Sequence, residues 1–443
     1  MNNMKNLKIL FIIWHIVLAF LLDQFSFMAT TYGLFILLFG TYYILGKPDF
    51  RGQYPSNFAA YIVGVEVFLR MTGADLFWEF GKYAEIYFLL LGIIRENTKI
   101  QIYYPILVYF ILLLPAVIFV PIDPFNLWRQ DVSFNLSGPA SLTCCSIYLI
   151  NRKINKEMLG EILFFMILPI VSMAIYNILI MPDLSIYRFM PHSDFYTSGG
   201  YGPNQVSTIF GFGIAGLLIA QVLKLSVTGS KFIDLLILIS FIGLGLITFS
   251  RGGIFAAIIS FACAISFYIF HDQKKIQIIS KGFGIVTVSI IVWMVMVSLT
   301  DGVIMQRYGF GKGEYGDKFV LDLTGRVKIY EIDLEIFIDH IFTGVGPGQA
   351  NELREKYGYG KAVVAHTEYS RMLAEHGILG LFSFLILIGV SIFQWTKPCS
   401  PSTKFIRIFF GLLALLTMSH SAMRLVMPSF LYGFLLSKYT EEI

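Results

Sequence analysis

Charged residues are scarce in this chain of 443 residues. Asp, Glu, Lys and Arg make up 14% of it, whereas soluble proteins average about 25%. Hydrophobic residues make up 56%, and the mean hydropathy is +0.71. This composition excludes an ordinary soluble domain and indicates a polytopic membrane protein. The formal net charge of +4 is small for this length, and we expect no nucleic-acid partner.

Cysteine is also rare, with four residues in the whole chain. Cys144 and Cys145 are adjacent in an apolar run, Cys263 lies in another, and Cys399 lies in a short basic connection. Neighbouring cysteines rarely pair with each other, and a buried cysteine usually packs as a small hydrophobe. We therefore expect no disulfide framework, no metal site and no cofactor.

Long apolar runs fill most of the chain, and a membrane span needs about 20 such residues. Several of the runs are short, so we predict about 12–14 transmembrane helices in an all-α fold. The whole chain, 1–443, is treated as a single membrane domain, with one large helical loop at 301–375. The candidate spans are 7–22, 29–46, 57–72, 81–94, 102–120, 139–151, 158–181, 205–224, 232–250, 253–271, 283–300, 376–395, 405–422 and 427–438.

The basic residues predict the orientation of these spans. If the N-terminus is cytoplasmic, the short basic connections all fall on the cytoplasmic side, as the positive-inside rule requires. The opposite side then receives Ile122 to Gly138, Pro182 to Asn204 and the long loop. Between Asp301 and Gly377 that loop has 12 acidic and 9 basic residues. The basic connections carry Lys47/Arg51, Arg95/Lys99, Arg152/Lys153/Lys156, Lys224/Lys231, Lys274/Lys275/Lys281 and Lys397/Lys404/Arg407.

The long loop has helical patterns of its own. Residues 325–340 predict an amphipathic helix with Thr324 as its N-cap. A glycine-rich turn, 344–348, is followed by a short second helix over 349–357. A third helix starts near Thr367 and leads into the span that begins at Ile378. The apolar face expected for the first helix consists of Val327, Tyr330, Leu334, Phe337 and Ile341.

Arg251 lies in the sequence Ser250-Arg251-Gly252-Gly253, at the outer junction of two consecutive spans. Glycines let the backbone approach a ligand closely, and the first turn of the next helix offers free N–H groups. An arginine at this point suits a phosphate group. The alternative is an interfacial arginine whose side chain reaches out to water.

Arg326 occupies the first turn of the amphipathic helix. A cation there opposes the helix dipole by a few tenths of a kcal/mol. With the helix N-terminus it forms a second candidate anion site. The alternative is a solvated side chain that pairs with an acidic neighbour.

His366 precedes the third helix of the loop. A histidine can take a proton from a hydroxyl group near neutral pH, so His366 is the candidate general base. Tyr369 and Arg371 follow within about a turn and are candidates for substrate binding. For Arg371 the alternative is structural, because Glu368 and Glu375 stand at the spacing of helical ion pairs.

The second outer loop adds two candidate substrate-binding residues, Arg188 and Asn204. Asn204 ends the glycine-rich stretch Gly199-Gly200-Tyr201-Gly202-Pro203-Asn204, which opens the next span and presents another helix N-terminus. Metal chemistry finds little support. Some ionisable residues lie inside or near spans, where such groups line a pathway or reach to the interface. They are Glu66, Arg70, Glu161, Asp234 and His420.

These motifs together resemble the O-antigen ligase and O-antigen polymerase family. The resemblance covers roughly Gly202 to Leu381 and rests on the order and spacing of several motifs. They are Gly202-Pro203-Asn204-Gln205, Ser250-Arg251-Gly252-Gly253, Gly325-Arg326, Gly344-Val345-Gly346-Pro347-Gly348, His366-Thr367-Glu368-Tyr369 and Leu373-Ala374-Glu375-His376-Gly377.

The resemblance implies a multi-pass enzyme of the bacterial inner membrane, with the architecture of C-type glycosyltransferases and a periplasmic active site. Such enzymes transfer a glycan from undecaprenyl diphosphate to a hydroxyl group, with inversion and without a metal. Carried over to this chain, Arg251 and Arg326 would stabilise the diphosphate leaving group and His366 would be the base. Many members have Asn after the histidine where this chain has Thr367.

The acceptor is open at this stage. The family implies one of three acceptors: a growing lipid-linked glycan, lipid A core or a protein hydroxyl. Membrane lipid is a further expected partner. The spacing of Arg188 and Gly199 resembles one described for O-antigen polymerases, and we lean slightly to a polymerase. A transporter or flippase of lipid-linked sugars and a non-catalytic membrane scaffold are the alternatives from other classes.

Overall fold

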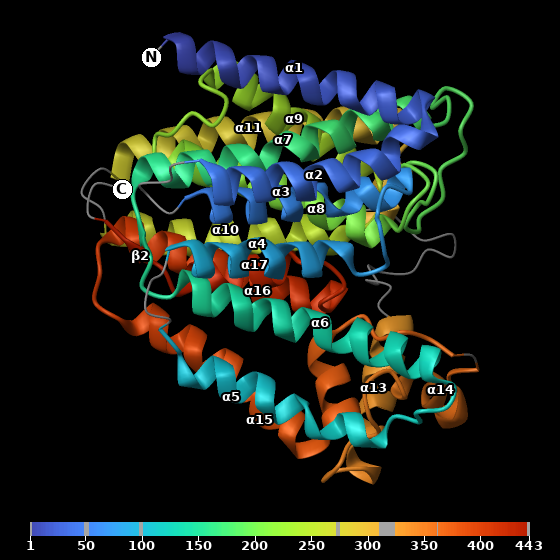
Figure 1. Ribbon diagram of the computed structural model, residues 1–443. Coiled ribbons are helices and arrows are strands. Elements are labelled where there is room, and N and C mark those ends of the chain that lie inside the picture. Colours follow the sequence, from blue (N-terminus) through green and yellow to red (C-terminus); the bar gives the residue numbers. More distant parts are fainter. Residues whose placement is uncertain are drawn as a thin grey trace.

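The computed structural model describes residues 2–47, 53–96, 101–271, 275–309, 324–360 and 362–440, and nearly all of them are helical. Each of the fourteen apolar runs forms a helix. Figure 1 shows that the axes of most of these helices lie roughly parallel to one another. They are α1 (Asn2–Gln24), α2 (Ser26–Gly46), α3 (Tyr54–Thr72), α4 (Phe80–Glu96), α5 (Tyr104–Leu113), α6 (Phe125–Leu149), α7 (Lys156–Ile180), α8 (Pro203–Val222), α9 (Lys231–Ile247), α10 (Arg251–His271), α11 (Lys275–Leu299), α15 (Glu368–Thr396), α16 (Pro401–Ser421) and α17 (Met427–Leu435).

The predicted polytopic helical membrane protein is confirmed. Seven helices in the described part of the chain are long and apolar enough to cross a membrane on their own. Others are shorter, and the count of 12–14 spans stays a prediction. The run 102–120 illustrates why, because α5 gives way at Pro115, which has no N–H to donate, to the 3₁₀ turn η1 (Pro115–Phe119). The seven are Met4–Gln24, Phe27–Gly46, Lys156–Ile180, Pro203–Val222, Arg251–Phe270, Glu368–Thr396 and Pro401–Ser421.

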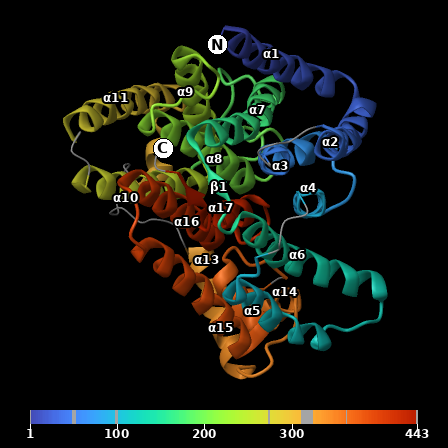
Figure 2. The same cartoon turned by 60° about the vertical axis from the view of Figure 1, so that its left-hand side comes forward.

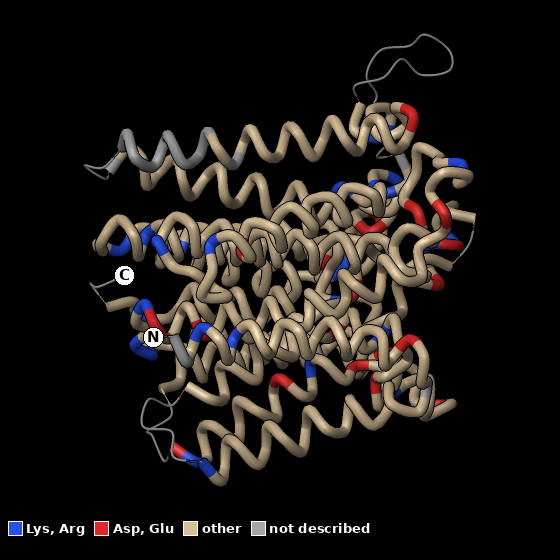
Figure 3. Tube along the Cα trace, turned by 90° about the horizontal axis from the view of Figure 1, so that it is seen from above, with Lys and Arg blue, Asp and Glu red and all other residues tan. Residues whose placement is uncertain are grey.

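Charge is distributed towards the two ends of the bundle. Figure 3 shows most Asp and Glu residues at the end opposite the two termini, which we call the external end. A short parallel pair of β1 (Lys153–Ile154) and β2 (Lys438–Tyr439) joins the C-terminal segment to a basic connection at the other end. Arg51, Lys99 and Lys274, three of the residues that predict the orientation, lie outside the described residues.

The long loop forms a helical lobe at the external end. Figure 2 shows α13 and α14 grouped with α5 and α15 on one side of the molecule. The predicted first helix, 325–340, is confirmed within one residue. The lobe consists of α12 (Val303–Tyr308), α13 (Thr324–Asp339), α14 (Ala350–Arg354) and the π-helical turn η2 (Glu355–Tyr359). Residues 310–323 and 361, part of the predicted loop, lie outside the described residues.

The apolar face predicted for α13 is wrong. Val327 and Tyr330 are each 45% exposed, whereas Ile332 and Ile336 are buried. The sequence of α13 has two apolar stripes at helical spacing, and its packing partners select the second one. Ile332 and Ile336 form a small core with Ala350 of α14 and Ala374 of α15. On the predicted face Val327, Tyr330 and Ile341 are exposed, and Leu334 and Phe337 are half-buried.

A buried ion pair reinforces this choice of face. Arg354 of α14 donates from Nε to Asp333 Oδ1 at 2.7 Å, and the Ser370 hydroxyl donates to Asp333 Oδ2 at 2.5 Å. Asp333 and Arg354 are both fully buried. A buried charge requires a partner, so Asp333 fixes α13, α14 and the start of α15 relative to one another.

Glycines let the lobe contact α15 directly through the backbone. Gly344 has φ of 63°, and a Cβ on it would lie 2.3 Å from the Glu375 carbonyl oxygen. The N–H of Val345 donates to Ala374 O at 3.1 Å, and that of Gly346 donates to Glu375 O at 3.0 Å. Opposite this turn α15 is kinked at Gly377, with φ of 57° and ψ of −139°. The outer part of α15 is therefore oriented by the lobe.

We expect Gly344→Ala to destabilise the protein by about 2 kcal/mol or more, because the new Cβ meets fixed backbone atoms. The thermal unfolding midpoint of the purified protein should fall by several degrees relative to wild type. Gly389→Ala is the matched control, since a Cβ there meets nothing within 4 Å. Equal midpoints for the two variants would contradict the close contact.

Candidate functional site

Tight packing between α8 and α10 brings Arg251 to the external end of the bundle. A Cβ on Gly253 would lie 2.4 Å from the carbonyl oxygen of Ser207, and one on Gly252 would lie 2.4 Å from Cδ2 of His420. Only glycine fits both positions without displacing a neighbour. The two glycines therefore let the first turn of α10, which begins with Arg251, rest directly on α8 and α16.

Arg251 is held in place by the short helix α12. Its Nη1 donates to the carbonyl oxygen of Arg307 at 2.8 Å, and Arg307 Nε donates to the carbonyl oxygen of Phe249 at 2.8 Å. The Arg251 side chain is half-buried. These reciprocal bonds tie the start of the long loop to the junction of α9 and α10.

Arg326 lies in the first turn of α13, as the sequence predicts. Its side chain is half-buried and makes no hydrogen bond or ion pair with another residue of the described ranges. Burial lowers the pKa of the Arg326 guanidinium, and the positive charge of Arg251 lowers it further. The two predicted anion-binding arginines therefore lie within electrostatic range of each other.

His366 faces the same positive region. Its side chain is half-buried, and its Nδ1 has no hydrogen-bond partner among the residues that the structure describes. Burial lowers the pKa of His366 to about 4, and the charges of Arg424, Arg326 and Arg354 act in the same direction. The imidazole is thus neutral at neutral pH and able to accept a proton.

Arg424 was not singled out by the sequence reasoning, yet it belongs to this region. Its Nη2 donates to the carbonyl oxygen of Ala365 at 2.6 Å, directly beside His366. Burial, together with the charge of Arg326, lowers the pKa of Arg424 to about 10. One signal was available, since a lone arginine stands in the short outer connection between the last two predicted spans. We call Arg251, Arg326, Arg424 and His366 the cationic cluster.

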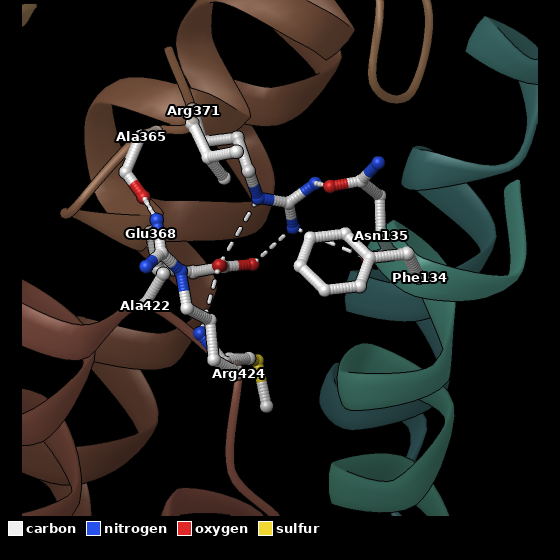
Figure 4. Close-up of a pocket in the computed structure, with 9 residues that line it drawn as sticks. Phe134, Asn135, Ala365, Glu368, Arg371, Ala422 and Arg424 are labelled. Atoms are coloured by element: carbon white, nitrogen blue, oxygen red, sulfur yellow. Dashed lines mark hydrogen bonds and ion pairs between the residues drawn. The ribbon is translucent and has the colours of Figure 1, made fainter. Parts of the chain in front are cut away.

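A small cavity adjoins the cationic cluster (Figure 4). Arg424 and Arg371 both point towards it, with the Glu368 carboxylate between them. Side chains and backbone of α6, α15 and two connecting segments form its wall. The lining residues are Phe134, Asn135, Val364, Ala365, Glu368, Arg371, Ala422, Met423 and Arg424.

Arg371 is buried and bound to protein groups. It forms ion pairs with Glu368 and, at 2.6 Å, with Glu375, and its Nη1 donates to Asn135 Oδ1 at 3.0 Å. Arg371 donates five hydrogen bonds in all, to Glu368, Asn135 and Glu375, and this favours the structural alternative, in which Arg371 joins α15 to α6. Substrate binding by Arg371 stays a prediction.

Tyr369 is directed into the bundle. Its hydroxyl donates to the carbonyl oxygen of Leu415 at 2.6 Å, and its ring packs on Phe384 with centroids 4.6 Å apart. These contacts anchor the outer part of α15 against α16. Tyr369 is half-buried, and substrate binding by it stays a prediction.

Asn204 and Arg188 differ in burial and in their contacts with other residues. Asn204 Nδ2 donates to the carbonyl oxygen of His420 at 3.0 Å, and its buried Oδ1 has no partner within the described ranges. Arg188 is exposed and makes no hydrogen bond or ion pair with another described residue. Its loop is attached to the junction of α9 and α10 by Asp194, whose N–H donates to Thr248 O at 3.0 Å.

The donor set of the site suits an anion. Among the described residues, no three His, Cys, Asp or Glu side chains gather where they could hold a metal ion. The carboxylates closest to the cluster, Glu368 and Asp333, are occupied by Arg371 and Arg354. Arg326 and Arg424 form no ion pair with any carboxylate in the part of the chain that the structure covers.

These features define a multi-pass helical membrane protein with a cationic site at one end of its bundle. Residues 235–385, about a third of the chain, match the family model described as O-antigen ligase. This match confirms the resemblance to the O-antigen ligase and polymerase family and supports a glycosyl-transferring role in surface polysaccharide assembly. The matched segment contains Arg251, Arg326 and His366 but neither Asn204 nor Arg424. No curated protein matches the chain.

We expect His366 to titrate far below an ordinary histidine. Diethyl pyrocarbonate modifies only the neutral imidazole, so its rate at His366, followed by peptide mass spectrometry, should have a midpoint near pH 4 instead of 6.5. Arg424→Gln should move that midpoint upward, because removing a nearby cation favours the protonated form.

Lys328→Gln serves as the control for this titration, since Lys328 is an exposed cation of α13 that bonds to the Gly358 carbonyl oxygen. It should leave the midpoint of His366 unchanged. A wild-type midpoint near 6.5, or the same midpoint in the Arg424→Gln variant, would contradict the electrostatic description of the site.

Proposed function

We propose that the protein is a glycosyltransferase that moves a glycan from undecaprenyl diphosphate to an acceptor hydroxyl at the periplasmic face of the bacterial inner membrane. The observation that carries this proposal is the cationic cluster. Arginines from three separate segments converge beside a neutral histidine, and two of them have no carboxylate partner among the described residues. Without a bound ligand, this arrangement raises the electrostatic free energy of the protein. It fits a site that receives a strongly anionic group.

The chemistry assigns a role to each part of the cluster. The acceptor oxygen bonds to the anomeric carbon as the bond from that carbon to the diphosphate oxygen breaks, with inversion. Negative charge grows on the leaving oxygen, and Arg251 and Arg326 stabilise it where it develops. His366 takes the proton of the acceptor hydroxyl, and no metal is required for this displacement.

Donor binding itself would improve the base. The cations that surround His366 disfavour its protonated form, and a bound diphosphate would offset their charge. The pKa of His366 then rises from about 4 towards the value that suits proton transfer at neutral pH. The site would therefore become active as a base only when the donor is in place.

The membrane setting follows from the donor. A polyprenyl chain lies in the bilayer, and its diphosphate lies at the interface, so a site at the end of a helical bundle can reach both. The acidic end of the bundle, which holds the cluster, would face the periplasm, and the basic connections would face the cytoplasm. The acceptor, whether lipid-linked glycan, lipid A core or protein, would approach from the periplasm.

The slight lean to a polymerase rests on Arg188. Its exposed side chain lies in an external loop that is attached to the junction bearing Arg251. A growing glycan is long, and an exposed cation in this loop could contact its distal sugars or their acidic groups. Arg188 would then affect acceptor use more than donor binding.

Proteoliposomes supplied with an undecaprenyl-diphosphate-linked oligosaccharide should form longer lipid-linked glycans, resolved by size. Arg251→Ala, Arg326→Ala and His366→Ala should each lower the initial rate by about 10²-fold or more, as expected for loss of charge stabilisation or of a general base. Lys328→Ala, an exposed cation on the same helix as Arg326, should keep the wild-type rate.

The products separate the remaining alternatives. Glycan on added lipid A core would identify a ligase, and glycan on a protein hydroxyl would identify an oligosaccharyltransferase. Movement of intact donor across the bilayer without transfer would replace the proposal by the transporter. Full activity in the His366→Ala variant would remove that residue as the base.

A further inference from the structure

The connection between α16 and α17 is fixed by charged side chains from other helices. Glu368 Oε2 accepts from the N–H of Met423 at 3.2 Å, and Glu66 Oε2 accepts from the N–H of Val426 at 2.8 Å. Arg70 Nη1 donates to the carbonyl oxygen of Arg424 at 3.2 Å. Three side chains of α3 and α15 therefore hold the backbone at Arg424 and on both sides of it.

Two of these groups form a buried pair in α3. Glu66 and Arg70 are 2.8 Å apart, and Arg70 also donates to Gln205 Oε1 at 2.8 Å. Burying charges inside a membrane bundle costs free energy, and the pair would be replaced by apolar residues if packing were its only purpose. Its bonds to Arg424 and Val426 indicate that it orders this connection.

The motifs at the starts of α8 and α10 act on the same connection. Asn204 donates to the carbonyl oxygen of His420, and Gly252 packs against the imidazole ring of His420. Ala422 has φ of 52°, which an alanine adopts only when its surroundings impose it. Segments far apart in the sequence thus combine to present a single side chain.

The Arg424 side chain has a hydrogen-bond donor that no described residue accepts from. One terminal nitrogen donates to Ala365 O, whereas its buried Nε has no acceptor among the described residues. A buried donor without an acceptor is unfavourable, and an anionic oxygen bound at this nitrogen would supply the missing acceptor. Arg424 forms part of the wall of the small cavity, and its guanidinium lies beside Ala365 (Figure 4).

We propose that Arg424 binds the diphosphate group of the donor as a third arginine, and that Glu66 and Arg70 are positioning residues that hold it. This inference rests on the proposed function. A diphosphate offers several anionic oxygens, and a guanidinium can bind two of them at once. Arg251 and Arg326 then contact one side of the group, and Arg424 contacts the side nearest His366.

Binding of short lipid analogues tests this directly by calorimetry on the full-length protein in detergent. Wild-type protein should bind farnesyl diphosphate more tightly than farnesyl monophosphate. Arg424→Gln should weaken binding of the diphosphate about 10–100-fold, the range of a lost charge-assisted bond, and reduce the preference over the monophosphate. Arg424→Lys should lose less, because charge remains but the planar fork does not.

Arg129→Gln is the matched control, since Arg129 is an exposed arginine at the external end of α6. It should bind both analogues as wild type does. The role of Arg424 is overturned if wild-type protein prefers the diphosphate and the Arg424→Gln variant has the wild-type affinity for each of the two analogues. If wild-type protein binds neither analogue, the proposed function fails instead.

A double-mutant cycle tests the positioning role. Arg70→Gln should weaken binding of farnesyl diphosphate in the wild-type background but have little further effect when Arg424 is already glutamine. Equal effects in the two backgrounds would show that Arg70 only stabilises the fold and would overturn its positioning role. Thermal unfolding of each variant separates loss of structure from loss of binding.

Discussion

Repulsion between arginines that lie close together is the constraint on which the external end of this molecule depends. Burial and the charge of Arg251 lower the pKa of Arg326, and burial and the charge of Arg326 lower the pKa of Arg424. Neither Arg326 nor Arg424 forms an ion pair with a carboxylate among the described residues. Such side chains would move apart unless their backbones were fixed. Paired charges provide that fixation, since Asp333 with Arg354 holds the lobe and other buried pairs hold the connecting segments.

The sequence predicted the helices well because lipid requires apolar runs, and such runs are visible without any knowledge of packing. The prediction failed where one helical pattern allowed two different faces to be buried. In α13 both the stripe with Val327 and Tyr330 and the stripe with Ile332 and Ile336 have helical spacing. Only the partner surfaces on α14 and α15, together with the buried ion pair of Asp333, decide between them. That information lies in contacts between distant segments.

The candidate site shows the same limit. Arg251, Arg326 and His366 stand beside glycines or helix starts, and these local signs made them visible in the sequence. Arg424 has no such sign, because the groups that hold it come from α3, α8 and α15. For Arg371 the helical spacing of Glu368 and Glu375 predicted ion pairs, which the structure contains, but not the bond to Asn135 that joins α15 to α6. Local patterns identify charged residues, but their remaining capacity for bonds depends on the fold.

The break in α15 at Gly377 separates two requirements that one straight helix would have to meet together. The segment beyond Gly377 lies among the spans, where its length and tilt must suit the thickness of the bilayer. The segment before it carries Glu368 and Arg371 and is oriented by the lobe through Gly344. Adaptation to a thicker or thinner membrane can therefore proceed in the inner segment while the geometry around His366 stays constant.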